Sequence, residues 1–262
     1  MIRSLYTAAT GMKANQLYID NISNNLSNVN TMGFKKSRIE FEDLIYQTIQ
    51  EPGTQTEEGF SKPTGLQVGL GVTPVSNQRI FAQGNLTQTG NPTDLAIQGD
   101  GFFQVRLPNG EVGYSRDGAF KINSEGYMTN SSGYLLEPNV IMPDEYRDLS
   151  IGPDGTVSAV LPGGDVGEVL GEIELARFVN PAGLKSLGGN MYESTEASGQ
   201  AIVDRPGNGN FGVLRNQYLE ASNVQLVEEM VSMIVAQRAY EVSSKSISTA
   251  DEMLTTANQL KR

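Results

Sequence analysis

Two segments at opposite ends of the chain carry apolar residues at heptad spacing, and they constrain the fold more than any other feature. In the first segment the apolar positions advance by alternating steps of three and four residues, with Asn15 as the polar exception. The seam positions of this segment are Leu5, Ala8, Met12, Ile19, Ile22, Leu26 and Val29. Such spacing is typical of a helix that packs lengthwise against another helix.

The second segment runs from about Tyr218 to Leu260 without Gly or Pro. At ~1.5 Å per residue, this predicts one helix roughly 60 Å long. Its seam positions are Leu226, Met230, Met233, Tyr240, Ile247 and Leu254. Between residues 226 and 235 the apolar side chains cover more than one stripe, and a surface that wide needs more than one partner helix. We therefore expect the two terminal helices to pair as a coiled coil.

The interior of the chain predicts an all-β module of short strands. Gly, Pro, Asn and Asp separate β-like runs at 94–98, 102–107 and 173–179. Asn109-Gly110 lies between two such runs and predicts a hairpin with a type I′ turn. Ahead of the module, Ser37-Arg38-Ile39-Glu40 has the pattern of a capping box, which predicts a second, short helix through about Ile49.

The predicted fold class is α+β, with long N- and C-terminal helices forming a coiled coil and a central all-β module of short strands and extended linkers. We assign a discontinuous terminal coiled-coil assembly domain to 1–40 and 216–262. An extended connector is assigned to 41–92 and 195–215, and the central β domain to 93–194.

Composition closes most routes to catalysis. The chain contains no His and no Cys, which removes imidazole bases, thiolate nucleophiles and most zinc and copper sites. A net charge of −11 disfavours nucleic acid and anionic membrane surfaces. No run approaches the roughly 20 apolar residues of a membrane span, and the first residues lack the pattern of a Sec signal peptide. We expect no catalytic residue, cofactor, metal site, nucleic-acid partner or membrane insertion.

Patterns that imitate chemical sites have plainer structural explanations. Gly69-Leu70-Gly71 resembles the start of a dinucleotide loop, but the third Gly is missing and Pro74 stands where a helix must begin. Three aspartates lack the spacing of a calcium loop and fit turns instead: Asp100, Asp117 and Asp154. The pairs Glu228-Glu229 and Asp251-Glu252 favour a solvated or inter-subunit charge face over a metal site.

The stretch Asn25-Leu26-Ser27-Asn28-Val29-Asn30-Thr31-Met32-Gly33-Phe34-Lys35 resembles the signature shared by flagellar rod and hook proteins. Within it, the motif residues are Asn25, Asn28, Thr31, Gly33, Phe34 and Lys35. The resemblance continues through 93–103, 114–120, 222–224, 229–231 and 236–240, and so spans nearly the whole chain. Residues 1–12 and 46–69 are similar to the distal-rod branch of the family. One β module leaves no room for the further outer domain of the hook branch.

At one place the chain departs from the family pattern. Asn216-Gln217-Tyr218 stands where the family usually has Gln-Gly before Leu-Glu, so the backbone conformation there stays open.

The resemblance implies a structural subunit, and not an enzyme, that assembles into the rigid hollow helical tube of the flagellar distal rod and transmits torque from motor to hook. Its implied partners are other copies of itself, proximal-rod proteins, the hook protein, the envelope bushing rings (P and L rings) and the flagellar export apparatus. It implies a location in the basal body in the periplasm, reached by type III export without a cleaved signal peptide. A segment from 51 to 65 is expected to stiffen the tube through Glu51, Pro52, Gly53, Phe60, Pro63 and Gly65.

Two other function classes stay open on the sequence alone. A secreted glycosidase acting on peptidoglycan needs two carboxylates ~5 to 9 Å apart in a cleft. A secreted adhesin or binding module accounts for the β region but leaves the two terminal seams unexplained.

Overall fold

The computed structural model describes residues 2–52, 64–143, 145–162 and 167–260. The chain forms two compact units. The helical unit comprises Met1–Ser27, Ser37–Gln78 and Gln225–Arg262, and the β unit comprises Asn28–Lys36 and Arg79–Val224. The architecture is α+β, with a helix at each end of the chain and a β-rich interior, as the sequence predicts.

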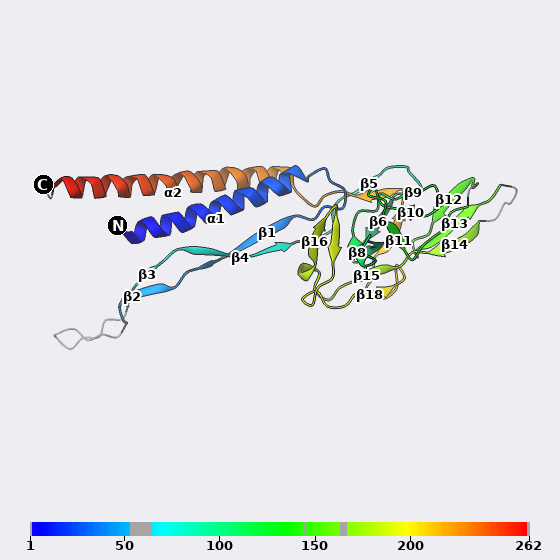
Figure 1. Cartoon of the computed structure of the whole chain (residues 1–262), viewed down its shortest axis with the longest axis horizontal. Helices are drawn as coiled ribbons and strands as arrows, with labels where there is room; N and C mark the ends of the chain where they lie inside the picture. The colour runs from blue at the N-terminus through cyan, green and yellow to red at the C-terminus, as the bar shows by residue number, and fades with distance from the viewer. Residues whose placement is uncertain (1, 53–63, 144, 163–166, 261–262) are drawn as a thin grey trace. The chain divides into compact units, whose positions relative to one another are not determined.

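In the helical unit, α1 (Ile2–Ser27) and α2 (Leu226–Leu260) lie side by side and run antiparallel (Figure 1). A Cβ added at Gly11 of α1 would lie 3.7 Å from the hydroxyl oxygen of Ser243 on α2, so the two helices approach closely there. Glu228 and Glu229 stand in the first turn of α2, where carboxylates interact favourably with the helix dipole.

The predicted start of the last helix at about Tyr218 is wrong. Tyr218–Glu220 is strand β20, which pairs antiparallel with β5 (Leu86–Gln88), and the helix begins at Leu226. Strand pairing with a segment far away in the sequence overrides the local helical pattern here.

The short helix predicted from Ser37 to about Ile49 is also wrong. The segment forms β1 (Ser37–Asp43) and β2 (Tyr46–Gln50), which pair with β4 (Val72–Arg79) and β3 (Leu66–Gly69), respectively. The hydroxyl of Ser37 donates to the side-chain oxygen of Asn21 at 2.5 Å, so it is already engaged by α1 and does not cap a helix.

The β unit is built on a nine-stranded sheet. Its main path runs β16 (Lys185–Gly188), β17 (Met191–Glu193), β8 (Val112–Ser115), β7 (Phe102–Arg106), β11 (Leu135–Glu137), β10 (Met128–Thr129) and β9 (Lys121–Ile122). β15 (Leu175–Arg177) pairs with both β7 and β18 (Ile202–Asp204). The smaller elements are the sheet of β12 (Asp148–Ile151), β13 (Thr156–Val160) and β14 (Glu168–Glu172), the pair β6 (Leu95–Gln98) with β19 (Val213–Asn216), and the 3₁₀ turn η1 (Pro181–Gly183).

Strand β7 supplies side chains to two apolar cores because successive residues of a strand point to opposite faces. Phe103 packs edge-to-face on Phe120 in the larger core, with ring centroids 5.1 Å apart. Its neighbour Phe102 packs against Phe178 in the smaller core at 5.8 Å. Both β7 phenylalanines are buried, so this strand is anchored in both apolar cores.

The hairpin predicted at Asn109-Gly110 is confirmed, because β7 and β8 pair antiparallel on either side of it. The predicted type I′ turn is wrong. Gly110 has a φ of 84°, but Asn109 is not among the described residues with positive φ, and a type I′ turn requires both. The N–H of Gly110 donates to the carbonyl oxygen of Leu107, which closes a turn that includes Pro108.

The backbone at Asn216-Gln217-Tyr218, left open by the sequence, is left-handed at its central residue. Gln217 has a φ of 64°, which for a residue with a side chain costs roughly 1–2 kcal/mol. Its N–H donates to the carbonyl oxygen of Asp94 at 2.9 Å, and its own carbonyl accepts from the N–H of Thr89 at 2.9 Å. These bonds hold Gln217 in a conformation that glycine adopts without strain.

We predict that Gln217→Gly raises the free energy of unfolding by about 1 kcal/mol, because it removes the strain and keeps both backbone hydrogen bonds. Urea-induced unfolding of the two proteins measures the difference. The matched control is Asn190→Gly, which also relieves a positive φ (61°). It deletes an amide that donates to the carbonyl oxygen of Met32 at 3.0 Å, so its free energy of unfolding should rise by less than that of Gln217→Gly, or fall. A lower stability for Gln217→Gly than for the parent contradicts the prediction.

Candidate functional site

The family-like motif ends in a buried ion cluster inside the β unit, and we call Lys35, Arg116 and Glu220 the ion cluster. The side chains of Lys35 and Glu220 are fully buried, with Lys35 Nζ 2.6 Å from Glu220 Oε1. Arg116, also buried, places Nη1 3.6 Å from Glu220 Oε2. Two cations therefore share one carboxylate away from solvent.

Each member of the ion cluster also binds backbone. Lys35 Nζ donates to the carbonyl oxygen of Ala82 at 2.8 Å, and Glu220 Oε1 accepts from the N–H of Gly84 at 2.8 Å. Arg116 Nη2 donates to the carbonyl oxygen of Gly99 at 2.9 Å. The cluster thus joins segments that lie far apart in the sequence.

Burial sets the electrostatics of the two cations. It lowers the pKa of Lys35, against the opposing charge of Glu220 and with the help of the like charge of Arg116. Burial likewise lowers the pKa of Arg116, and Glu220 followed by Asp100 opposes that change. Charges this deep are tolerated only when they are paired and hydrogen-bonded.

Gly33 explains why the motif requires glycine. Its φ is 68°, and a Cβ there would lie 2.6 Å from the backbone nitrogen of Asp117. Its N–H donates to the carbonyl oxygen of Glu220 at 2.7 Å, so the turn contacts β20 directly. Either the left-handed backbone or the close contact is enough to exclude larger residues.

The residues on either side of Lys35 are held in the same way. The guanidinium carbon of Arg79 lies 5.4 Å from the centroid of the buried Phe34 ring, and Arg79 Nη1 donates to the carbonyl oxygen of Lys35 at 2.9 Å. Asn223 accepts from the N–H of Lys36 at 2.7 Å and donates to the carbonyl oxygen of Ile80 at 2.8 Å.

The remaining motif residues lie in a turn and in the helical unit. Thr31 and Asn28 close a turn through a side-chain hydrogen bond of 3.1 Å. In the helical unit, Asn25 Oδ1 accepts from the N–H of Ser37 at 3.0 Å, while Nδ2 donates to Ser37 O at 2.9 Å and to Glu229 Oε2 at 3.3 Å. One amide therefore joins α1, β1 and α2.

These contacts involve polar residues that lie off the predicted apolar seams. Asn21 and Asn25 are buried between elements. Glu229 is buried against Asn25 and does not lie on a solvated face, in contrast to its exposed neighbour Glu228. Each finds hydrogen-bond partners in a different element, which periodicity within one helix does not reveal.

The predicted seam residues occupy three kinds of position. Ile22 is buried, and the half-buried members are Leu5, Ala8, Met12, Ile19, Leu26, Met233, Ile247 and Leu254. Leu226, Met230 and Tyr240 are exposed, and Val29 lies beyond the end of α1 in the β unit. Among the α2 side chains that the structure describes, the buried ones are Glu229, Ala236 and Ala250, whose spacing is a multiple of seven.

The segment expected to stiffen a tube is described only at its ends. Glu51 and Pro52 follow β2, and Gly65 precedes β3. Gly53, Phe60 and Pro63 lie outside the described residues.

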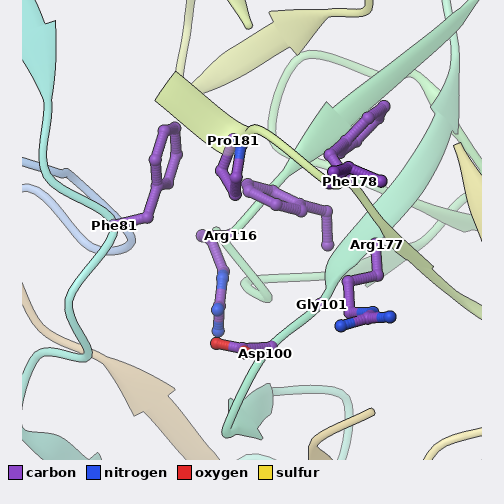
Figure 2. A pocket seen from close by; sticks show the side chains of 9 residues that line it. Phe81, Asp100, Gly101, Arg116, Arg177, Phe178 and Pro181 are labelled. Atoms are coloured by element: carbon purple, nitrogen blue, oxygen red, sulfur yellow. The ribbon is translucent and has the colours of Figure 1, made fainter. Parts of the chain in front are cut away.

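A pocket of about 200 Å³ opens beside Arg116 (Figure 2). Its lining residues are Phe81, Asp100, Gly101, Phe102, Arg116, Arg177, Phe178, Val179 and Pro181. Asp100 is the one carboxylate in this lining, so the pocket does not provide the carboxylate pair that a glycosidase needs.

Within the described part of the chain, no group of three or more His, Cys, Asp or Glu side chains is placed to hold a metal ion. No described helix is long and apolar enough to cross a membrane. The arrangement of the motif joins chain segments and does not assemble reactive groups. Sequence reasoning missed Arg79, Arg116, Glu220 and Asn223, although Arg116 and Asn223 stand in stretches that resemble the family.

We predict that Lys35→Met lowers the free energy of unfolding by about 3–5 kcal/mol, because Glu220 keeps a buried charge with a weaker partner. In a double-mutant cycle with Glu220→Gln, the double variant should lose less than the sum of the single losses. Chemical denaturation measures all four proteins. The control is Lys185→Met, which breaks the exposed pair of Lys185 with Glu193 (2.9 Å) and should change stability by about 1 kcal/mol or less. Equal effects at Lys35 and Lys185 would show that the buried pair is not specially important.

Three family models match parts of this sequence. The model described as "Flagella basal body rod protein" matches residues 5–35, which include the motif. The model "Flagellar hook protein FlgE/F/G D1 domain" matches 96–159, and "Flagellar basal body rod FlgEFG protein C-terminal" matches 215–260.

The matches to individual proteins extend over the full chain. "Flagellar basal-body rod protein FlgG" of Borreliella burgdorferi is 51% identical over 264 residues, covering 100% of both chains. The FlgG protein of Buchnera aphidicola subsp. Acyrthosiphon pisum is 48% identical, covering 99% of this chain and 100% of its own. The crystal structure of the Helicobacter pylori flagellar hook protein FlgE2 matches 62% of this chain and 47% of that chain, with 18% identity and a TM-score of 0.26. On the strength of the full-length identities, the chain belongs to the family of flagellar basal-body rod proteins of the FlgG type, which are structural proteins and not enzymes.

Proposed function

We propose that this chain is a structural subunit of the flagellar distal rod, and that its copies assemble through their terminal helices into a rigid, hollow helical tube that transmits torque from the motor to the hook. The proposal is supported by family membership over the full chain length. It is also supported by the surface that a single copy leaves uncovered.

That surface is an apolar patch at the start of α2, and it is the observation that carries the proposal. We call it the α2 patch, made of Leu226, Val227, Met230, Val231, Ile234 and Val235, whose side chains are 47–71% exposed. Since α1 packs against another face of α2, these residues have no cover within the described helical unit. Exposed apolar surface of this kind marks a protein contact.

The α2 patch predicts the geometry of assembly. A patch on one face of α2 that meets a different surface on the next copy makes a heterologous contact, and such contacts build a helical filament when they do not close into a ring. We propose that the half-buried seam residues, such as Ile19 and Met233, form a coiled coil within one copy. The exposed seam residues, Leu226, Met230 and Tyr240, would then contact neighbouring copies.

We predict that the triple variant Val227→Asn, Val231→Asn, Ile234→Asn stays monomeric under conditions in which the parent forms tubes. The substitutions remove exposed apolar contacts between copies and leave the α1–α2 interface in place. Negative-stain electron microscopy and sedimentation measure assembly, and circular dichroism checks that the helices persist. Gln237→Asn, at an exposed polar position of the same helix, should assemble normally. Tubes from the folded triple variant would place the assembly surface elsewhere.

We further propose that residues 51–65 stiffen the tube. The described ends of this segment continue a two-stranded ribbon, in which Gln50 pairs with Leu66 (Figure 1). Tyr46, Ile49 and Leu66 on the ribbon are exposed and available to neighbouring copies.

Deleting residues 53–63 should therefore leave assembly possible but yield curved or flexible tubes, because most of the proposed stiffening segment is removed. Electron microscopy of tube curvature is the measurement. Deleting residues 163–166, which connect β13 to β14, serves as a control and should leave the tubes straight. Straight, rigid tubes from both deletions would contradict a stiffening role for 51–65.

The partners follow from the same proposal. We infer contacts with proximal-rod proteins, the hook protein, the P and L rings and the flagellar export apparatus, in a periplasmic position reached by type III export without a cleaved signal peptide. Membership of the basal-body rod family supports this placement. Antibody labelling of isolated basal bodies tests this position. Label on the rod is expected, and label on the hook or filament instead would contradict the proposal.

A further inference from the structure

The pocket beside Arg116 contains cationic groups that lack acceptors. Arg116 Nε and Nη1 and Arg177 Nε are buried atoms without a hydrogen-bond partner among the described residues. Both arginines line the pocket, and Arg116 is only 3% exposed. Figure 2 shows both side chains among the residues that line the pocket.

The protein's own carboxylates do not satisfy these atoms. Glu220 Oε2 lies 3.6 Å from Arg116 Nη1 and itself has no hydrogen-bond partner, because the carboxylate is committed to Lys35 through Oε1. Asp100, an exposed residue, lies near Arg116 in the lining of the pocket (Figure 2). The charged side chains that line the pocket are Arg116, Arg177 and Asp100, which leaves one positive charge in excess.

The free groups fit a carboxylate. Arg116 Nε–H and Arg177 Nε–H can each donate one charge-assisted hydrogen bond to a carboxylate oxygen. The ring of Phe102 lies 5.4 Å from the Arg116 guanidinium carbon and restricts its movement, and Phe211 lies similarly 5.8 Å from that of Arg177. The pocket holds its donors ready before any ligand arrives.

We propose that this pocket binds a carboxylate, and that the carboxylate is an acidic side chain of a second copy of this chain. The rim indicates a protein and not a free anion as its source. Val179 at the pocket is 83% exposed, and Ile202, the strand partner of Arg177, is 45% exposed. Exposed apolar side chains beside buried arginines are typical of contacts between proteins, whose most important contact residues are enriched in Arg. The chain itself, with 30 Asp and Glu residues and 19 Lys and Arg residues, offers many acidic side chains.

The occupant rests on the proposed self-assembly, but the site can be tested without it. In the full chain kept below its assembly concentration, sodium acetate is titrated at constant ionic strength against chloride. The Nε–H resonances of Arg116 and Arg177 are followed by ¹H–¹⁵N NMR. We expect both resonances to shift in a saturable way with acetate but not with chloride, and Arg177→Gln to weaken acetate binding by about tenfold or more. Arg147→Gln, at an exposed arginine of the same β unit, should bind acetate as the parent does.

A second arm identifies the source of the carboxylate. Acetate should slow tube formation by the parent, and Arg177→Gln should form far fewer tubes while Arg147→Gln assembles normally. Absence of saturable shifts at both arginines would overturn the carboxylate site. Normal assembly of Arg177→Gln despite lost acetate binding would overturn the second copy as the source. If neither the parent nor Arg147→Gln forms tubes, the result counts against the proposed assembly. The NMR titration still decides whether the pocket binds a carboxylate.

Discussion

Lys35 and Glu220 are 185 residues apart in the sequence, yet Nζ and Oε1 lie 2.6 Å apart with no solvent exposure on either side chain. A buried charge is tolerated only with a partner. The pair therefore requires that the Asn28–Lys36 and Arg79–Val224 segments of the β unit fold together. The backbone of Gly33 reinforces this by donating to Glu220 O. The position of the motif end, Gly33 to Lys35, depends on these contacts with Glu220.

In the helical unit a buried amide takes the place of the ion pair. There the buried amide of Asn25 binds β1 through Ser37 and α2 through Glu229, so α1, β1 and α2 have a defined register without a deep ion pair of opposite charges. Directional polar contacts of this kind favour one arrangement over others that bury similar apolar area. In both units, the family motif acts by ordering the chain and not by exposing reactive groups.

What remains unsatisfied within one copy points outwards to assembly. The α2 patch exposes apolar side chains that α1 does not cover, and the Arg116 pocket keeps guanidinium N–H groups without acceptors. The first supplies non-directional attraction that scales with buried area, and the second supplies directional bonds to a single acidic group. A subunit of a rigid shaft benefits from both, because buried apolar area gives adhesion while directional hydrogen bonds define orientation.

The sequence by itself determined the two terminal helices, the β-rich interior and the hairpin at Asn109-Gly110, because periodicity and turn residues act over a few neighbouring positions. It also determined the family, through the stretch that ends at Lys35. Only the tertiary structure decided that Ser37 begins a strand, that α2 starts at Leu226 and that Asn21 and Asn25 are buried. The partners that decide these features, such as β5 for Tyr218–Glu220, lie far away along the chain, where local patterns carry no information about them.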